Sequence, residues 1–139
     1  MKKFSLSAML VTSLAFAGFA QQTEVPGEAP HAEIYFEETV HDFGALEYKG
    51  NGTYEFQFSN TGTAPLLITN ATSTCGCTVP SYSKEPIAPG EKGAITVKYD
   101  TSRQGGINKP ITVSSNAKNN PSVVLYIKGE VKAPAAPAQ

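Results

Sequence analysis

This chain of 139 residues has little histidine, cysteine or tryptophan, and its net charge is small. It contains two histidines, two cysteines and no tryptophan, and its formal net charge is -1. A near-neutral chain lacks the basic surface that attracts nucleic acid or an anionic membrane, so we expect neither as a partner. Because His31 and His41 are the sole imidazole bases, a nucleophilic active site has few candidates. We therefore expect no catalytic residue, no enzyme activity and no cofactor.

The amino terminus predicts export. Residues 1–3 carry two lysines, residues 4–20 are largely apolar, and small residues lie three places and one place before Gln21. This pattern is typical of a secretory signal peptide, here residues 1–20. The apolar run is short for a membrane-spanning anchor, so we expect no transmembrane segment after cleavage. The predicted location is the periplasm or the extracellular space, and the expected partner is another envelope or secreted protein.

Composition divides the rest of the chain into three parts. Residues 21–32 are polar and contain two prolines, which indicates a flexible lead-in. Residues 33–131 contain short apolar patterns separated by turn residues, and we interpret them as one domain. Residues 132–139 are rich in proline and alanine, a composition that favours extended, solvated chain rather than a core.

Alternating hydrophobicity predicts an all-β domain. After the Asn51–Gly52 turn, Tyr54, Phe56 and Phe58 alternate with polar residues, as in a strand with one buried face. Similar alternation recurs further along, Gly105–Gly106 is expected to interrupt the chain, and residues 123–127 are apolar on both faces, as in a central strand. No helical periodicity follows the signal peptide. We predict an immunoglobulin-like β-sandwich of about seven strands, with a small barrel as the alternative.

Both cysteines lie in one short segment, with Gly76 between Cys75 and Cys77. Residues two apart on a strand share a face, so we expect the two sulfurs side by side. Extended backbone would separate the two Cα atoms by roughly 6.6–7.2 Å, at the upper edge of what a disulfide accepts, and Gly76 could bend the chain. Three interpretations stay open: packed small thiols, a redox or thiol-exchange pair, and a soft-metal site for copper or zinc.

His41 is a secondary candidate, as a possible partner of Cys75 or Cys77. Nothing in the spacing supports that pairing. His41 and Asp42 are neighbours on an expected strand, so their side chains point to opposite faces and do not form a dyad. The favoured interpretation is a satisfied strand histidine beside a turn-forming or solvated aspartate.

Several segments resemble a family of small exported bacterial domains of unknown function, number fifteen seventy-three in the domain-of-unknown-function series. The matching segments are residues 40–44, 58–62, 65–68, 73–78, 87–91 and 109–113. The resemblance covers about residues 33–131, and Cys-Gly-Cys in its Ser/Thr context is its most specific part. It implies an immunoglobulin-like fold, related to Hydin-like and major-sperm-protein-like sandwiches, and an exported location, but no established activity.

Domains of that kind are mostly protein-binding or assembly modules, an analogy at the level of the fold. We therefore expect an exported binding or structural module of the cell envelope. A thiol-redox or thiol-exchange protein and a soft-metal binder, both using Cys75 and Cys77, remain the alternatives.

Overall fold

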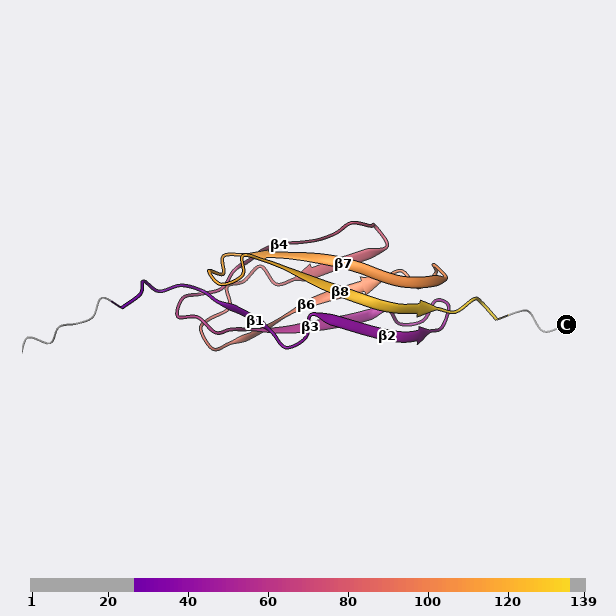
Figure 1. Ribbon diagram of the computed structural model, residues 1–139, viewed down its shortest axis with the longest axis horizontal. Helices are drawn as coiled ribbons and strands as arrows, with labels where there is room; N and C mark the ends of the chain where they lie inside the picture. The colour runs from indigo at the N-terminus through magenta and orange to yellow at the C-terminus, as the bar shows by residue number, and fades with distance from the viewer. Residues whose placement is uncertain (1–26, 136–139) are drawn as a thin grey trace, which may run out of the picture.

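Eight strands in two sheets make up the computed structural model, which describes residues 27–135 (Figure 1). Their bounds are β1 Ile34–Phe36, β2 Val40–Leu46, β3 Thr53–Asn60, β4 Ile68–Ser73, β5 Thr78–Tyr82, β6 Lys92–Tyr99, β7 Gly105–Ser115 and β8 Ser122–Val131. The first sheet has the order β1-β3-β6-β5 and the second the order β2-β8-β7-β4. This confirms the predicted all-β sandwich, with one strand more than expected. The predicted signal peptide, residues 1–20, lies outside the described residues.

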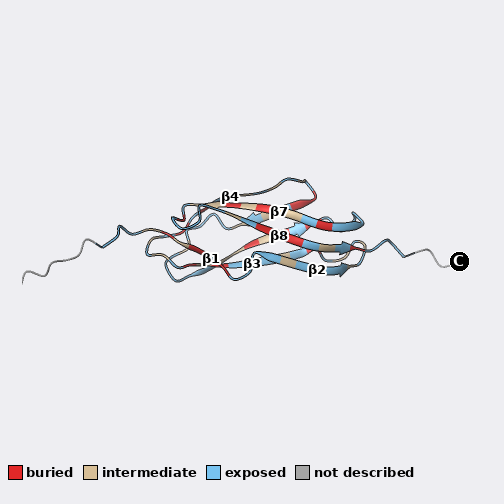
Figure 2. Ribbon diagram, in the orientation of Figure 1, coloured by how far each residue is buried: buried red, intermediate tan, exposed pale blue. Residues whose placement is uncertain are grey.

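The core lies between the two sheets and is built by alternation along the strands (Figure 2). The first sheet contributes Phe56 and Phe58 from β3, while Tyr54 on the same face is half-buried. The facing side chains of the second sheet and those of β6 are also buried: Ile95, Val97, Tyr99, Ile111, Val113, Leu125 and Ile127. Since burying one such side chain contributes roughly 1.5–3 kcal/mol, this layer holds the sheets together. The alternation predicted around Phe56 is confirmed.

β8 is a central strand, as predicted, but it buries one face only. It lies between β2 and β7, and Leu125 and Ile127 point into the core. On the opposite face Val124 is 41% exposed and Tyr126 is 39% exposed. The expectation of two buried faces was wrong because, within the described part of the chain, the outer face of this sheet is not covered by a third layer.

Two glycines expected to interrupt the chain instead begin a strand. Gly105 and Gly106 pair with Val131 and Glu130 at the start of β7. Gly105 has φ +111°, a conformation open to glycine at little cost. The glycine pair therefore belongs to the ladder with β8, and the predicted break is wrong.

The first two strands run along one edge of the sandwich and change sheets between Phe36 and Val40 (Figure 1). β1 pairs antiparallel with β3 in the first sheet. β2 pairs parallel with β8 in the second, with Val40 opposite Tyr126. Further along β2, Gly44 has φ +64° and its N–H donates to Oδ1 of Asp42 at 2.8 Å, where the register with β8 shifts. Asp42 is thus a turn-forming residue within an edge strand.

A buried asparagine at the end of β3 organises one end of the sandwich. Asn60 donates from Nδ2 to the carbonyls of Ala64 at 2.8 Å and Ile87 at 2.9 Å. Its Oδ1 accepts from the N–H of Gly62 at 3.0 Å. The side chain therefore fixes the Asn-Thr-Gly turn and ties it to the chain before β6.

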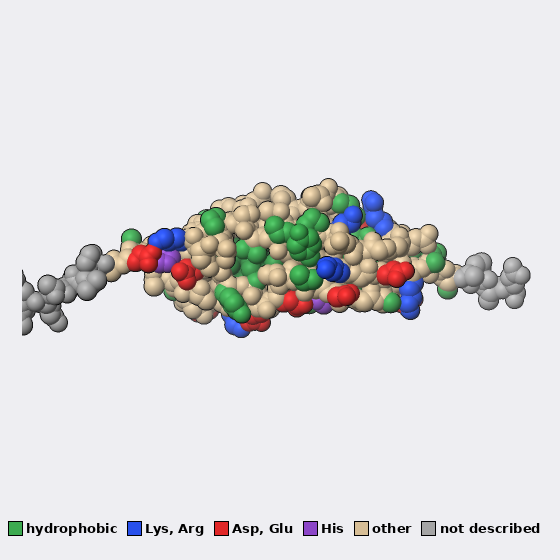
Figure 3. Space-filling model, viewed as in Figure 1, with side chains coloured by type: hydrophobic (Ala, Val, Ile, Leu, Met, Phe, Trp, Pro, Cys, Tyr) green, Lys and Arg blue, Asp and Glu red, His purple; other side chains and the backbone are tan. Residues whose placement is uncertain are grey.

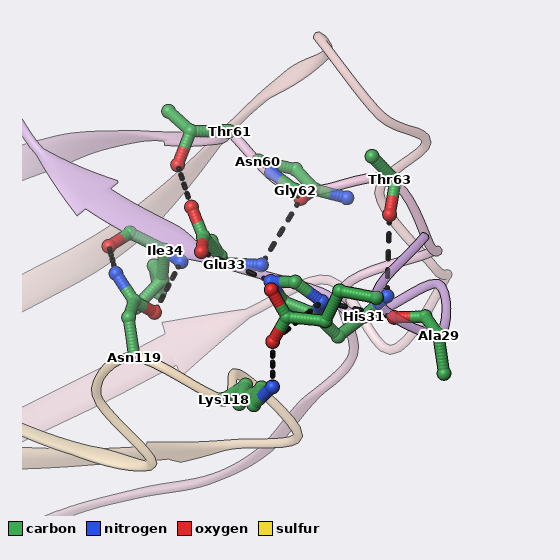
Figure 4. A network of polar contacts seen from close by, with 11 residues as sticks. Ala29, His31, Glu33, Ile34, Asn60, Thr61, Gly62, Thr63, Lys118 and Asn119 are labelled. Carbon is green, nitrogen blue, oxygen red and sulfur yellow. Dashed lines mark hydrogen bonds and ion pairs between the residues drawn. The ribbon is translucent and has the colours of Figure 1, made fainter. Parts of the chain in front are cut away.

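The segment before β1 is fastened to the same end (Figure 4). The carbonyl of His31 accepts from the N–H of Thr63 at 2.8 Å, the carbonyl of Ala32 accepts from the N–H of Lys118 at 2.8 Å, and Ala32 is buried. His31 also places its Nε2 3.0 Å from Oε1 of Glu33. The packed chain thus begins at His31, two residues before the predicted domain boundary, because turn backbone satisfies the polar groups of the lead-in.

Candidate functional site

The cysteine pair lies in the turn between β4 and β5, where the chain crosses from the second sheet to the first. Cys75 and Cys77 form a disulfide, and their Cα atoms are 5.2 Å apart. The N–H of Thr78 donates to the carbonyl of Cys75 at 3.3 Å, closing the turn around Gly76. The expectation that both cysteines sit on an extended strand was therefore wrong. A turn brings them within the Cα distance that a disulfide accepts.

The two sulfurs have different surroundings. Cys77 is buried, at 3% exposure, and its Sγ lies 3.7 Å from Oγ1 of Thr78. Cys75 is partly exposed, and its Sγ accepts from the N–H of Cys77 at 3.1 Å. The carbonyl of Cys77 is held by the N–H of Asp100 at 2.8 Å. The backbone of the turn is thus anchored to the end of β6, with one sulfur inside and one near the surface.

A surface depression of about 280 Å³ adjoins this turn. Its lining residues are Gly76, Cys77, Val79, Lys98, Tyr99 and Asp100. A larger depression of about 620 Å³ shares Lys98, Tyr99 and Asp100 as a wall. Ser102 donates to the Asp100 carboxylate from its hydroxyl at 2.6 Å and its N–H at 3.0 Å, with Arg103 nearby, and these contacts lower the pKa of Asp100. The hollow beside the turn is mostly apolar but has Lys98 and Asp100 in its lining, and the larger hollow that shares these residues is more polar.

His41 is not brought to the cysteines. It lies on β2, and β2 and β4 are the opposite edges of the second sheet. Its ring stacks on Tyr54, with the ring centroids 3.4 Å apart and an interplanar angle of 8°, and contacts the edge of Phe43. The ring of His41 is thus packed against two aromatic rings, and its role stays a prediction.

The structure offers the predicted soft-metal site little support. Among residues 27–135, no three His, Cys, Asp or Glu side chains are grouped so that they could hold a metal ion. Both sulfurs are engaged in the disulfide, whereas copper and zinc bind the thiolate form.

A second surface feature, which the sequence analysis missed, is an apolar area on the outer face of the second sheet. We call Val40, Val124 and Tyr126 the outer patch. Val40 lies directly opposite Tyr126 in the ladder, and all three side chains are exposed. Figure 3 shows hydrophobic side chains gathered near the middle of this face. The apolar run at residues 123–127 was the available signal, because a half-buried strand with apolar residues on both faces leaves one set exposed.

Two stacked sheets, with no helix among residues 27–135, and a first strand pair that changes sheets define an immunoglobulin-like sandwich. Solved structures share this fold. A protein of unknown function from Porphyromonas gingivalis has a TM-score of 0.65 at 18% identity, over 77% of this chain and 51% of that one, so the present chain spans about half its length. The ASH / PapD-like domain of human CEP192 has a TM-score of 0.62 at 10% identity, over 97% and 100%. The CupB2 chaperone of Pseudomonas aeruginosa has a TM-score of 0.51 at 10% identity, over 70% and 55%.

The chain belongs to the family described as protein of unknown function (DUF1573), whose model matches residues 34–131. This is the family that the sequence resemblance indicated, and the match confirms it. No curated protein matches the chain. Within residues 27–135 the structure contains no helix that is long and apolar enough to cross a membrane.

Proposed function

We propose that this chain is an exported binding module of the cell envelope, and that β2 receives an extended segment of a partner protein. The observation that carries the proposal is an open edge strand beside the outer patch. Among the described residues β2 has a single neighbouring strand, β8. An exposed sheet edge of this kind can accept an added strand, whose main chain supplies affinity while alternate side chains supply specificity.

The hydrogen bonding of β2 identifies the groups that a partner would use. The N–H of Tyr126 donates to the carbonyl of Thr39 at 2.8 Å, which marks the residues of β2 that face β8. Backbone groups alternate sides along a strand, so Val40 and Asp42 direct their N–H and C=O groups away from β8. An added strand would lie beside Val40, and its outward side chains would extend the outer patch.

Two further observations support this proposal. A disulfide such as Cys75–Cys77 persists in oxidising compartments, in keeping with the export predicted from residues 1–20. The similar fold of the CupB2 chaperone associates this architecture with a protein that handles other chains, an argument from fold alone. Binding rather than catalysis is the function that an open sheet edge serves.

The test distinguishes the contribution of the β2 backbone to partner binding from the contribution of its side chains. A photo-crosslinking residue at position 42 should capture a discrete protein from envelope extract, whereas the same residue at position 55, exposed on the central strand β3, should not. Val40→Pro removes an N–H that points away from β8 and should abolish capture, because proline on an edge strand leaves the ladder to β8 intact. Val40→Ala keeps that N–H and should weaken capture only partly.

The captured segment is then identified, synthesised and titrated into the purified protein. Amide hydrogen exchange at Val40 and Asp42 should slow on binding. Equal capture at positions 42 and 55, or capture unaffected by Val40→Pro, would refute strand addition at β2.

A further inference from the structure

We propose that the Cys75–Cys77 disulfide is a thiol-exchange site that accepts two electrons from a protein dithiol, with Cys75 as the sulfur that is attacked. This site is independent of the strand-addition surface. The disulfide lies beside β4, and β2 is the opposite edge of the same sheet.

A structural role does not explain this bond well. The two cysteines are separated by one residue, and a crosslink removes chain entropy in proportion to the logarithm of the loop it closes. The closed loop here is nearly the smallest possible. The connection between β4 and β5 is already only residues 74–77, so the disulfide adds little that the backbone does not provide.

The unequal surroundings of the two sulfurs assign their roles. Cys75 is partly exposed, whereas Cys77 is buried, so an incoming thiolate reaches Cys75 first. The N–H of Cys77 lies 3.1 Å from Sγ of Cys75, and a donor at this position stabilises a thiolate there. Cys77 has Oγ1 of Thr78 at 3.7 Å, a hydroxyl that can donate to it when the bond opens.

The exchange balances in two steps. A thiolate of the partner attacks Sγ of Cys75, a mixed disulfide forms, and Cys77 leaves with the electron pair of the broken S–S bond and takes a proton from water. The second thiol of the partner then loses its proton and attacks the partner's own sulfur in the mixed disulfide. The partner leaves as a disulfide, and Cys75 is released as a thiolate that takes up a proton. Two electrons and two protons have moved to the pair.

The surface beside the turn fits a protein as the donor of these electrons. The depression next to Gly76 shares Lys98, Tyr99 and Asp100 with the larger, more polar one. Val79, at its margin, is 59% exposed. A largely apolar hollow with charged residues in its lining suits a loop of a protein, which can contact both, better than a small thiol.

The test compares the two thiols one at a time in the full mature chain. Cys77→Ser leaves Cys75, Cys75→Ser leaves Cys77, and the double variant is the control for folding, measured by circular dichroism. In native buffer, Cys75 should react with oxidised glutathione at least about tenfold faster than Cys77, because Cys77 is buried and the reagent cannot reach its sulfur as easily. In urea the two rates should converge.

The wild-type chain supplies the second measurement, which does not depend on the variants folding. Excess dithiothreitol should reduce the bond while the fold is retained, and limited alkylation should label Cys75 before Cys77 in a peptide map. Equal native rates, or reduction no faster than global unfolding, would overturn the proposal and make the bond structural.

Each of the two proposals can be refuted without refuting the other. Val40→Pro should leave the exchange rate at Cys75 unchanged, and the double cysteine variant should leave capture at position 42 unchanged. A small dithiol that reacts as fast as every protein dithiol tried would show that the adjoining depression does not recognise a partner.

Discussion

Replacing Asn60 with alanine should be among the most destabilising polar substitutions in this domain. The side chain is 1% exposed and makes four hydrogen bonds to backbone, with lengths of 2.8, 2.9, 3.0 and 3.4 Å, the longest from the N–H of Glu33. The carbonyl of Ile87 keeps a second donor, the N–H of Leu66 at 2.8 Å. The carbonyl of Ala64 and the N–H of Gly62 lose the partner that Asn60 provides. Each such loss costs about 1–3 kcal/mol, so Asn60→Ala should cost about 2–6 kcal/mol.

Urea unfolding of the mature chain measures this cost. With an m-value of about 1.5 kcal/mol per molar urea, a loss of 3 kcal/mol lowers the midpoint by about 2 M. Asn116→Ala is the matched control, because Asn116 also makes two hydrogen bonds to backbone, at 2.7 and 3.1 Å, but is exposed. Water replaces those bonds, so the control should lose no more than about 1 kcal/mol.

Asn60→Asp sharpens the test. It keeps the acceptor for Gly62 but turns an oxygen toward two carbonyls, so near neutral pH it should destabilise the fold at least as much as alanine does. Its cost should fall in acid, because a protonated carboxyl donates one hydrogen bond. If Asn60→Ala and Asn116→Ala differ by less than about 0.5 kcal/mol, the buried asparagine does not hold the turn, and the reasoning is wrong.

Three further predictions concern the same domain. Replacing both Cys75 and Cys77 with serine should lower the free energy of unfolding by at most about 2 kcal/mol, because the chain-entropy relation gives about 1.6 kcal/mol for a three-residue loop; a loss above 4 kcal/mol in urea unfolding would contradict this. Gly62→Ala should loosen the segment before β1, since a methyl group there would press into backbone, with one contact at 2.5 Å; amide exchange in β1 should rise while β6 stays protected. The ring of His31 donates a hydrogen bond to the carbonyl of Ala29, and this bond is the main reason that the pKa of His31 is raised above 6.5. The stability it contributes is therefore complete below pH 6.5 and is lost as pH rises through its folded pKa; His31→Gln should flatten this part of the pH profile, and an unchanged profile would argue against it.

The strands that bury one face could be predicted because their signal is local. Phe56 and Phe58 alternate with polar residues whatever their partners are, and the period of two fixes which face is buried. The exposure of Val124 and Tyr126 could not be predicted in the same way. Whether a third layer covers the outer face of a sheet is a property of the whole architecture.

The cysteine site was predicted in its residues but not in its geometry. The spacing of Cys75 and Cys77 marked them as a candidate pair, yet it did not reveal that the chain changes sheets there. The surroundings of His41 depend on residues that lie even further away in the sequence. Its stacking on Tyr54 follows from the parallel pairing of β2 with β8, and no local pattern in the sequence encodes that pairing.

That parallel pairing also sets the order in which the domain can be completed. Val40 pairs with Tyr126, which lies 126 - 40 = 86 positions later in the chain. Contacts between residues so far apart form late in folding, because the chain between them must first be closed into a loop. A ribosome or a secretion pore that delivers this chain from its amino terminus therefore releases β2 long before its neighbour emerges. The strand proposed to receive a partner is thus also the strand that stays unpaired for longest during biosynthesis. A chain that ended before β8 would leave β2 without its neighbour and open to pairing with other chains.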